Sequence, residues 1–290
     1  MIDFEYAAPT ELDEAIRKLA AAGDSGRVLA GGTDIIVQLR EGLRSADLVV
    51  DVKKIPELTQ LELSGEQGLH LGASVSCRQI YDDQNIAAAY PGLADAVRII
   101  GGWQIQSRAS VGGNLCNSSP AADAIPPLIA YGAQAQIAGP NGQRVVPVEE
   151  FCTGPGRNIL QQGELLVALT LPSQPSGAGS AYQRFIPRNE MDIAVAGAAS
   201  WVHMDKTGER IEQARIALSA VAPTPVFAAE ASGWVRGRVG SEEVFAEAGE
   251  LAKRVATPID DMRGTAEYRT HLVGVLTKRT LATACERARK

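Results

Sequence analysis

The sequence predicts a protein of mixed α+β class that is built from two domains. Its 290 residues approach the length at which chains divide, and they are 45% hydrophobic and 21% charged, as in a globular protein. Segments with strand character and segments with helix character succeed each other along the chain. The Pro-, Ser- and Gly-rich stretch PSQPSGAG, residues 172–179, separates these segments into two groups. We therefore expect one domain over residues 1–175 and a second, smaller domain over residues 178–290.

Net charge and hydropathy exclude two classes of partner. The formal net charge is −6 and the isoelectric point is about 5.3, so we expect no nucleic acid partner. No uninterrupted apolar run approaches the roughly 20 residues of a membrane helix, so we expect no integral membrane segment. The first residues, MIDFEYAAPTELDEAI, are acidic and lack the apolar core of a signal peptide. We therefore expect a cytoplasmic protein.

The cysteines and histidines indicate that the chain holds no metal of its own. No two cysteines have the spacing of a zinc or iron–sulfur site, and the histidines are far apart in sequence. Only folding could bring them together into a metal site or a histidine-based triad. In the cytosol the cysteines are expected to be thiols. The residues are Cys77, Cys116, Cys152, Cys285, His70, His203 and His271.

The first elements of the larger domain follow from capping and turn signals. Residues 9–23, PTELDEAIRKLAAAG, predict a helix with a threonine cap and a glycine end. Residues 26–42, GRVLAGGTDIIVQLREG, predict a short buried strand, a glycine turn and a helix capped by Thr33 or Asp34.

The rest of this domain is expected to alternate in the same way. LHLGASVS, residues 69–76, alternates as a half-buried strand does. Residues 86–101 predict a helical region with Pro91 near the start of its second part. Residues 135–148 predict a hairpin with Asn141-Gly142 at its turn. An apolar strand over 46–52 and a short helix over 124–134 complete the set.

The smaller domain is expected to contain strands followed by helices. Strands are predicted over residues 192–204, 211–223 and 226–235. Helices are predicted over residues 241–256 and 266–290.

The first candidate site is AGGTD, between the strand and the helix of residues 26–42. Because glycine has no Cβ, backbone N–H groups there can approach a ligand closely and φ can be positive. The helix N-terminus just beyond favours an anion such as a phosphate group. A tight strand-to-helix turn without a ligand explains the same residues equally well. The candidate residues are Ala30, Gly31, Gly32, Thr33 and Asp34.

A dinucleotide-binding βαβ unit is a tempting alternative for this segment. A strand, a glycine turn, a helix and a second strand carrying Asp51 occur in the order that such a unit requires. However, GGTDII is not G-x-G-x-x-G, because the third glycine, which lets the helix pack closely, is absent. The sequence therefore argues against this interpretation.

The second candidate site is ASVGGNLCNSSPAADAIPP, residues 109–127. Gly112 and Gly113 allow close approach, and Asn114 offers both a donor and an acceptor. An anionic ligand with a sugar would use the N–H groups for phosphate and a carboxylate such as Asp123 for hydroxyls. The alternative is a glycine-rich loop whose polar side chains cap local turns. Two such loops, about eighty residues apart in one domain, favour a dinucleotide-sized cofactor with phosphates in its middle.

A pair of arginines forms the third candidate element. Arg184 and Arg188 flank a strand or turn at the start of the smaller domain. An exposed arginine pair is usually only a solvated surface. At a junction of two domains, however, a cation could touch a cofactor lying in the cleft between them.

These elements, in this order and spacing, resemble the FAD-binding medium subunits of the xanthine dehydrogenase and carbon monoxide dehydrogenase family of molybdenum hydroxylases. The resemblance runs nearly end to end. It implies a two-part FAD-binding domain of the vanillyl-alcohol-oxidase (PCMH) type, followed by a small α+β domain like that of the CO dehydrogenase flavoprotein. The matching stretches are FEYAAPTELDEAI, LAGGTDII, ASVGGNLCNSSPAAD, GELLVALTLP and RFIPRNEMDIAVAGAA.

The resemblance also implies roles for individual residues. Asp123 would hold ribose or ribityl hydroxyls of FAD, and Leu166 would pack near the flavin ring system. Arg184 matches a basic position near the isoalloxazine, where relatives often carry Lys. Gly112 would belong to the cofactor site as a position of close approach. The cradle for the FAD diphosphate would consist of Ala30, Gly31, Gly32, Thr33, Asp34, Ser110, Gly113 and Asn114.

The implied partners are two further subunits. A large subunit with the molybdenum cofactor would oxidise the organic substrate, and a small subunit with [2Fe–2S] clusters would relay electrons to FAD. FAD would pass them to NAD⁺, a quinone or another acceptor, and the complex would be a dimer of heterotrimers. We expect no catalytic residue in this chain, because the flavin supplies the chemistry. In 4-hydroxybenzoyl-CoA reductases this subunit carries a loop with a [4Fe–4S] cluster, which four scattered cysteines cannot form.

Two other functions compete with this interpretation. A self-sufficient flavin oxidoreductase of the same fold would need a substrate pocket with its own proton donor, and no Ser, Tyr or Glu can be defended as that donor. A non-catalytic binding or assembly module would have a degenerate cofactor site. Both glycine stretches are intact, which argues against such a module.

Overall fold

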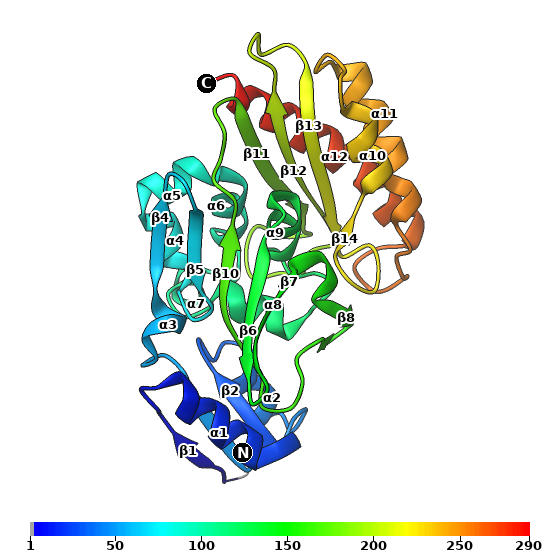
Figure 1. Ribbon diagram of the computed structural model, residues 1–290. Coiled ribbons are helices and arrows are strands. Elements are labelled where there is room, and N and C mark those ends of the chain that lie inside the picture. Colours follow the sequence, from blue (N-terminus) through cyan, green and yellow to red (C-terminus); the bar gives the residue numbers. More distant parts are fainter. Residues whose placement is uncertain (1–2) are drawn as a thin grey trace.

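The computed structural model describes residues 3–290. Its first unit is a small parallel sheet with the strand order β1-β3-β2. Helix α1 packs on this sheet through Ala15, Ile16 and Leu19, which share one helix face. The unit lies at the blue end of the molecule in Figure 1. Its elements are β1 (Glu5–Ala7), α1 (Leu12–Ala22), β2 (Gly26–Leu29), α2 (Ile35–Arg40) and β3 (Leu48–Asp51).

The second unit is a five-stranded antiparallel sheet with the strand order β4-β5-β10-β6-β7. Its middle strand, β10, is the last of the five in sequence and carries the apolar run LLVALTL. The chain therefore returns to fill the centre of the sheet before it enters the third unit. The strands are β4 (Leu61–Ser64), β5 (Gly68–Gly72), β6 (Gln134–Gly139), β7 (Gly142–Pro147) and β10 (Leu165–Leu171).

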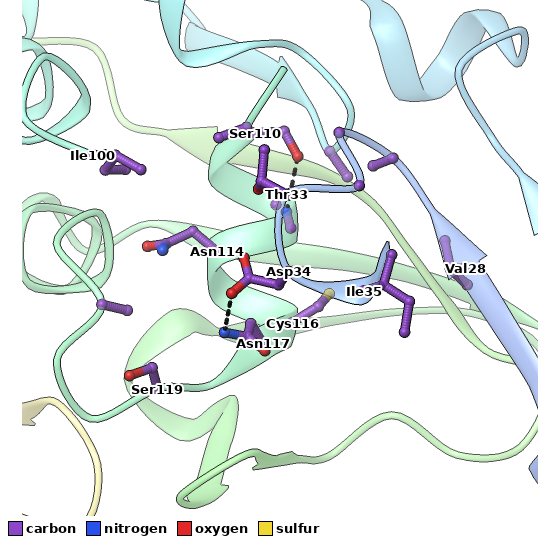
Figure 2. Close-up of a pocket in the computed structure, with 18 of the residues that line it drawn as sticks. Val28, Thr33, Asp34, Ile35, Ile100, Ser110, Asn114, Cys116, Asn117 and Ser119 are labelled. Carbon is purple, nitrogen blue, oxygen red and sulfur yellow. Dashed lines mark hydrogen bonds between the residues drawn. The ribbon is translucent and has the colours of Figure 1, made fainter. Parts of the chain in front are cut away.

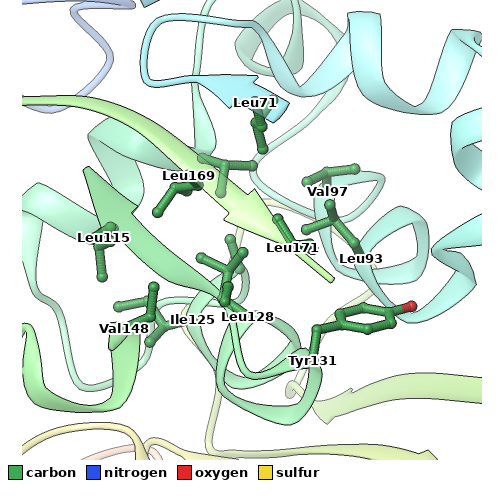
Figure 3. Packing of buried hydrophobic residues seen from close by; sticks show 14 of the residues in the cluster. Leu71, Leu93, Val97, Leu115, Ile125, Leu128, Tyr131, Val148, Leu169 and Leu171 are labelled. Carbon is green, nitrogen blue, oxygen red and sulfur yellow. The ribbon is translucent and has the colours of Figure 1, made fainter. Parts of the chain in front are cut away.

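Short helices cover one face of this sheet and enclose the largest core. Leu71 and Leu169 of the sheet meet Leu115 of α8 and Leu128 of α9, and all four side chains are fully buried (Figure 3). This packing fixes the position of α8, which carries the second candidate site. The helices are α4 (Cys77–Asp82), α5 (Gln84–Ala89), α6 (Pro91–Val97), α7 (Trp103–Gln106), α8 (Val111–Asn117) and α9 (Ile125–Tyr131). Helix α3 (Pro56–Thr59) instead contributes Leu58 to the core that α1 shares with the first sheet.

The third unit is a four-stranded antiparallel sheet covered by helices. Its strand order is β11-β12-β13-β14, and the long helix α12 packs across β11 and β12 (Figure 1). The elements are β11 (Ala178–Phe185), β12 (Ala196–Met204), β13 (Ile211–Ser219), β14 (Val226–Phe227), α10 (Ala229–Val235), α11 (Glu242–Ala252) and α12 (Ala266–Ala288). A small ribbon elsewhere pairs β8 (Cys152–Gly154) with β9 (Arg157–Asn158), and 3₁₀ turns span Gly23–Ser25, Val148–Glu150 and Lys253–Val255.

Ion pairs join the third unit to the rest of the chain. Arg287 of α12 contacts Asp95 of α6 at 2.6 Å, and Arg215 of β13 contacts Glu149 at 2.5 Å. Both pairs are partly exposed. A third pair, which is buried, lies at the cleft described below.

Most predicted elements are present, with several corrections. The helix of residues 9–23 begins at Leu12, so Thr10 lies too early to cap it, and Glu11 takes the cap position without a side-chain hydrogen bond. The glycine end is confirmed at Gly23, whose φ is +59°. The hairpin is confirmed, but its turn is Pro140-Asn141, because Gly139 pairs with Gly142.

Two predicted strands are present but differ from the prediction in how deeply they are buried, and a third predicted strand is mostly helix. Strand β5 is almost completely buried, not half-buried, because both of its faces are covered. Leu69 and Leu71 face the largest core, while Gly68 and Gly72 lie against the backbone of residues 171–173 and of Leu58. Strand β2 is only partly buried, since one of its sides lines a cleft. Most of residues 226–235 form helix α10, because AAEA is a run of strong helix formers.

None of the helices within residues 3–290 is both long enough and apolar enough to span a bilayer. In the same part of the chain, no three His, Cys, Asp or Glu side chains are grouped to hold a metal ion.

Candidate functional site

A cleft of about 590 Å³ lies where the three units meet. Its walls come from the β2–α2 turn, helix α8, the start of β10, and residues 191–194 before β12. The twelve residues to which the sequence analysis assigns a role in FAD binding all line this one cleft, although they span 155 positions of the chain from 30 to 184. They are Ala30, Gly31, Gly32, Thr33, Asp34, Ser110, Gly112, Gly113, Asn114, Asp123, Leu166 and Arg184.

The β2–α2 turn presents unpaired backbone donors to the cleft. The N–H groups of residues 31–34 find no acceptor among residues 3–290. A Cβ on Gly31 would lie 2.0 Å from the Arg108 carbonyl oxygen, and Gly32 has a φ of +80°. Both positions therefore require glycine for the path of the backbone itself. Such a row of free donors is suited to an anion.

Lys53 and Asp51 support this turn from behind. The Lys53 ammonium donates to the Ala30 carbonyl at 3.0 Å and contacts Asp51 at 2.7 Å. The other oxygen of the Asp51 carboxylate accepts from the Tyr6 hydroxyl at 2.7 Å. Both oxygens of Asp51 thus have partners within the chain, and Asp51 does not line the cleft. Its position agrees with the rejection of the dinucleotide-binding interpretation.

The second glycine stretch is a helix and not the loop that the sequence predicts. Ser110 caps α8 by accepting from the Gly113 N–H at 3.0 Å, while the Val111 and Gly112 N–H groups have no acceptor in the described chain. A Cβ on Gly112 would lie 2.5 Å from the Ala73 carbonyl oxygen, whereas the same atom on Gly113 would meet only the Ser110 hydroxyl, at 3.0 Å. Gly112 thus allows close packing, and Gly113 leaves open space at the cleft.

Asparagine and aspartate side chains tie these two walls together. The Asn117 amide of α8 donates to the Asp34 carboxylate at 3.2 Å and accepts from Gln38 of α2 at 3.2 Å. Figure 2 shows the Asp34–Asn117 contact, with Thr33 and Ser110 among the labelled residues of the same cleft. Asp34 occupies the cap position of α2 but its side chain does not cap the helix, because Asn117 holds the carboxylate. Burial raises the pKa of Asp34, and a hydrogen bond from Thr33 partly offsets this.

The close packing of Gly112 against residue 73 leads to a prediction for the stability of the chain. Gly112→Ala is expected to lower the free energy of unfolding by about 1–3 kcal/mol, because the backbone of residue 73 must move to admit the methyl group. Urea denaturation measures this effect. Gly233→Ala in helix α10 is the control, since a Cβ at Gly233 meets nothing within 4 Å. Equal stability of the Gly112→Ala and native chains would contradict the packing role.

Asp123 and Arg184 form a buried ion pair in the cleft wall. Arg184 Nη1 lies 2.5 Å from Asp123 Oδ2, and the two side chains are only 6% and 8% exposed. Arg184 Nη2 donates to the Ile99 carbonyl at 2.8 Å, and Asp123 Oδ1 accepts from the Tyr182 hydroxyl at 2.7 Å. Burial raises the pKa of Asp123 to about 6, against the opposing effects of Arg184 and Tyr182. Both oxygens of the carboxylate thus have partners within the chain.

The remaining part of the cleft is apolar. Leu166 lies next to a register shift of β10 against β6, which changes the direction of the strand at this point. Further apolar lining is supplied by Ile100, Ile105, Leu160, Leu165 and Ile193. An aromatic ring system can pack against such a surface.

Several lining residues escape the sequence reasoning. Asn117 lies three residues after Asn114 on the same helix face, so it could have been found if α8 had been predicted as a helix. Arg27 and Arg44 also line the cleft and form no ion pair within residues 3–290, and no sequence signal distinguishes them from other arginines. Arg188 is not part of the lining; its side chain turns to Asp192, 3.7 Å away.

The residues present fit the cofactor that the sequence suggests. Free N–H groups at the β2–α2 turn and at the start of α8 suit a diphosphate. The open space over Gly113 and the apolar surface around Leu166 leave room for a sugar and a ring system beyond it.

Comparison with known proteins identifies the family. Residues 2–174 match the family model described as the FAD binding domain in molybdopterin dehydrogenase. The chain belongs to this family. Residues 180–284 match a second model, the CO dehydrogenase flavoprotein C-terminal domain. The family predicted from the five sequence stretches and the two-part fold are thereby confirmed.

Individual relatives match over nearly their full length. The xanthine dehydrogenase FAD-binding subunit of Escherichia coli O157:H7 is 32% identical, with 98% of this chain and 97% of the relative covered. The carbon monoxide dehydrogenase medium chain of Hydrogenophaga pseudoflava is 31% identical, with 98% of each chain covered. A chain of the CO dehydrogenase from Oligotropha carboxidovorans superposes with a TM-score of 0.94 at 31% identity, covering 99% of this chain and 100% of that one. This chain is therefore an FAD-binding medium subunit of an oxidoreductase of the xanthine and CO dehydrogenase type.

Proposed function

We propose that the cleft holds one FAD and that the chain conducts electrons through it. The observation that carries this proposal is that residues 31–34 and Gly112, whose backbone N–H groups have no acceptor within residues 3–290, line one cleft. These donors would bind the diphosphate. The Asn114 side chain would contact a sugar, and the apolar surface at Leu166 would hold the flavin ring system.

The residues of this chain would bind, orient and desolvate FAD. The bound flavin would supply the electron-transfer chemistry. Asp123 is proposed to act through Arg184 and not by direct contact with sugar hydroxyls, because both of its oxygens already have partners. The Asp123–Arg184 pair would give the ring end of the cleft a fixed dipole in a nearly water-free wall.

We also propose the partners and the direction of electron flow. A small subunit with [2Fe–2S] clusters would deliver electrons that a large molybdenum-containing subunit takes from the organic substrate, and the complex would be a dimer of heterotrimers. NAD⁺, a quinone or another acceptor would receive the electrons from FAD. In this assembly, residues 1–175 would form the FAD-binding domain. Residues 178–290 would form the second domain, which contributes Arg184 to the wall of the cleft.

The partner proposal is tested by purifying the tagged chain from its own cells. The expected result is a complex in which iron, molybdenum and FAD elute together in a constant ratio across the peak. A chain that carries FAD without iron or molybdenum, and that turns over an organic substrate by itself, would contradict the proposal and support a self-sufficient oxidoreductase.

A further inference from the structure

Tyr182 lies outside the cleft but contacts the ion pair that forms its wall. Side chains alternate between the two faces of a strand, and Arg184 comes two residues after Tyr182 in β11. The two side chains therefore lie on the same face of the strand. Its hydroxyl donates to Asp123 Oδ1 at 2.7 Å, while Arg184 holds Oδ2 of the same carboxylate. Tyr182, Asp123 and Arg184 thus contact one another in sequence, and Asp123 and Arg184 reach the cleft.

The fold holds the Tyr182 ring in one place. The residue is only 3% exposed, and its backbone N–H donates to the Asp95 carboxylate at 3.1 Å. Gly197 of β12, which pairs with Arg184, leaves room for the hydroxyl, since a Cβ there would lie 2.7 Å from it. A tyrosine that is locked in this way is a rigid donor, and burial raises its pKa well above the usual value, so the proton stays on the oxygen.

We propose that Tyr182 is a positioning residue of the cofactor cleft, which holds the Asp123 carboxylate so that Arg184 is fixed against the ring end of the bound FAD. This inference rests on the proposed function. Without the hydroxyl, the carboxylate loses one of its two partners and can rotate away from Arg184. The Arg184 guanidinium would then keep only the Ile99 carbonyl as a fixed acceptor.

Other charged groups near these three contacting side chains already have partners of their own. Asp95, next to the Tyr182 backbone, is paired with Arg287. Burial, together with the nearby Asp123 charge, raises the pKa of the Cys77 thiol of α4 to about 12. This thiol therefore stays neutral. Asp123 is therefore the group in this cluster that is expected to titrate near neutral pH.

Substitution of Tyr182 by phenylalanine tests the inference in the whole chain loaded with FAD. The pH dependence of the bound-FAD absorption and fluorescence is recorded for the native chain and for Tyr182→Phe. In the native chain we expect a transition near pH 6, where Asp123 titrates. In Tyr182→Phe we expect its midpoint to rise by about one pH unit, because a hydrogen bond that favours the carboxylate is lost.

Two further variants make the result specific. Tyr131→Phe removes another buried hydroxyl, which bonds to Ser180 away from the cleft, and it should leave the midpoint unchanged. Asp123→Asn keeps a polar side chain of the same shape but cannot titrate, so its transition should vanish. This variant also tests the assignment if Tyr182→Phe folds poorly.

The outcomes separate the inference from the proposed function. If the native chain binds no FAD, the proposed function fails first. If it binds FAD but shows no transition, or if Tyr182→Phe and the native chain have the same midpoint, the positioning role is wrong. A transition that persists in Asp123→Asn would overturn it as well, because another group would then be titrating.

Discussion

Gly113→Val is expected to weaken FAD binding by at least about 100-fold, or about 2.7 kcal/mol, while the chain remains folded. The position lies in the first turn of α8 and lines the cleft, and a Cβ there would meet only the Ser110 hydroxyl within the protein. The valine side chain would therefore extend into the space proposed for FAD. Titration of the apo-chain with FAD, followed by flavin fluorescence, measures the loss.

The matched control is Gly233→Val, which makes the same change in a short helix far from the cleft. A Cβ at Gly233 has no neighbour within 4 Å, so FAD affinity should stay at the native value. Circular dichroism of both variants shows whether the fold is retained. A folded Gly113→Val chain with native affinity would mean that the start of α8 does not contact the cofactor.

Asp123→Ala is expected to lower the free energy of unfolding by about 3–5 kcal/mol, because it leaves Arg184 buried without its partner. The same change removes the acceptor of the Tyr182 hydroxyl. Glu230→Ala is the control, since it breaks the exposed pair with Arg254 and should cost at most about 1 kcal/mol. If the two variants were equally stable in urea, Asp123 would not hold the two parts of the chain together.

The destabilisation should also depend on pH in a defined direction. Burial places the pKa of Asp123 in the folded chain at about 6, above the usual carboxyl value. The stability that this group contributes is therefore full below about pH 4 and is lost as the pH rises through about 6. The difference in stability between the native and Asp123→Ala chains should widen by about 1 kcal/mol from about pH 7 to about pH 5. A difference that narrows over this range would contradict the raised pKa.

The positions of the glycines that line the cleft could be predicted from the sequence, because the local backbone conformation and packing require glycine there. Gly31 and Gly32 lie where the backbone must pass close to residue 108 or adopt a positive φ, and few other residues can do so. The same reasoning gave a wrong conformation for residues 111–117. Two adjacent glycines disfavour a helix, but packing of Leu115 into the core and the Ser110 cap outweigh that preference.

The partners of the polar side chains could not be predicted. Asp123 meets Arg184 and Tyr182, which lie about sixty residues further along the chain, so nothing local indicates that its oxygens are occupied. The contact between Asp34 and Asn117 likewise joins positions 83 residues apart. Such pairs depend on how the units pack, and a single sequence carries no pattern for them.

FAD binding in the cleft is tested most directly by identifying and counting the cofactor that the purified chain holds. The visible absorption spectrum is recorded first, and the small molecule released by heat is then identified by mass spectrometry, with free FAD added back to any colourless preparation. We expect one FAD per chain, either as purified or after reconstitution. A folded chain that contains no FAD and takes none up would contradict the placement of the cofactor between the β2–α2 turn and helix α8.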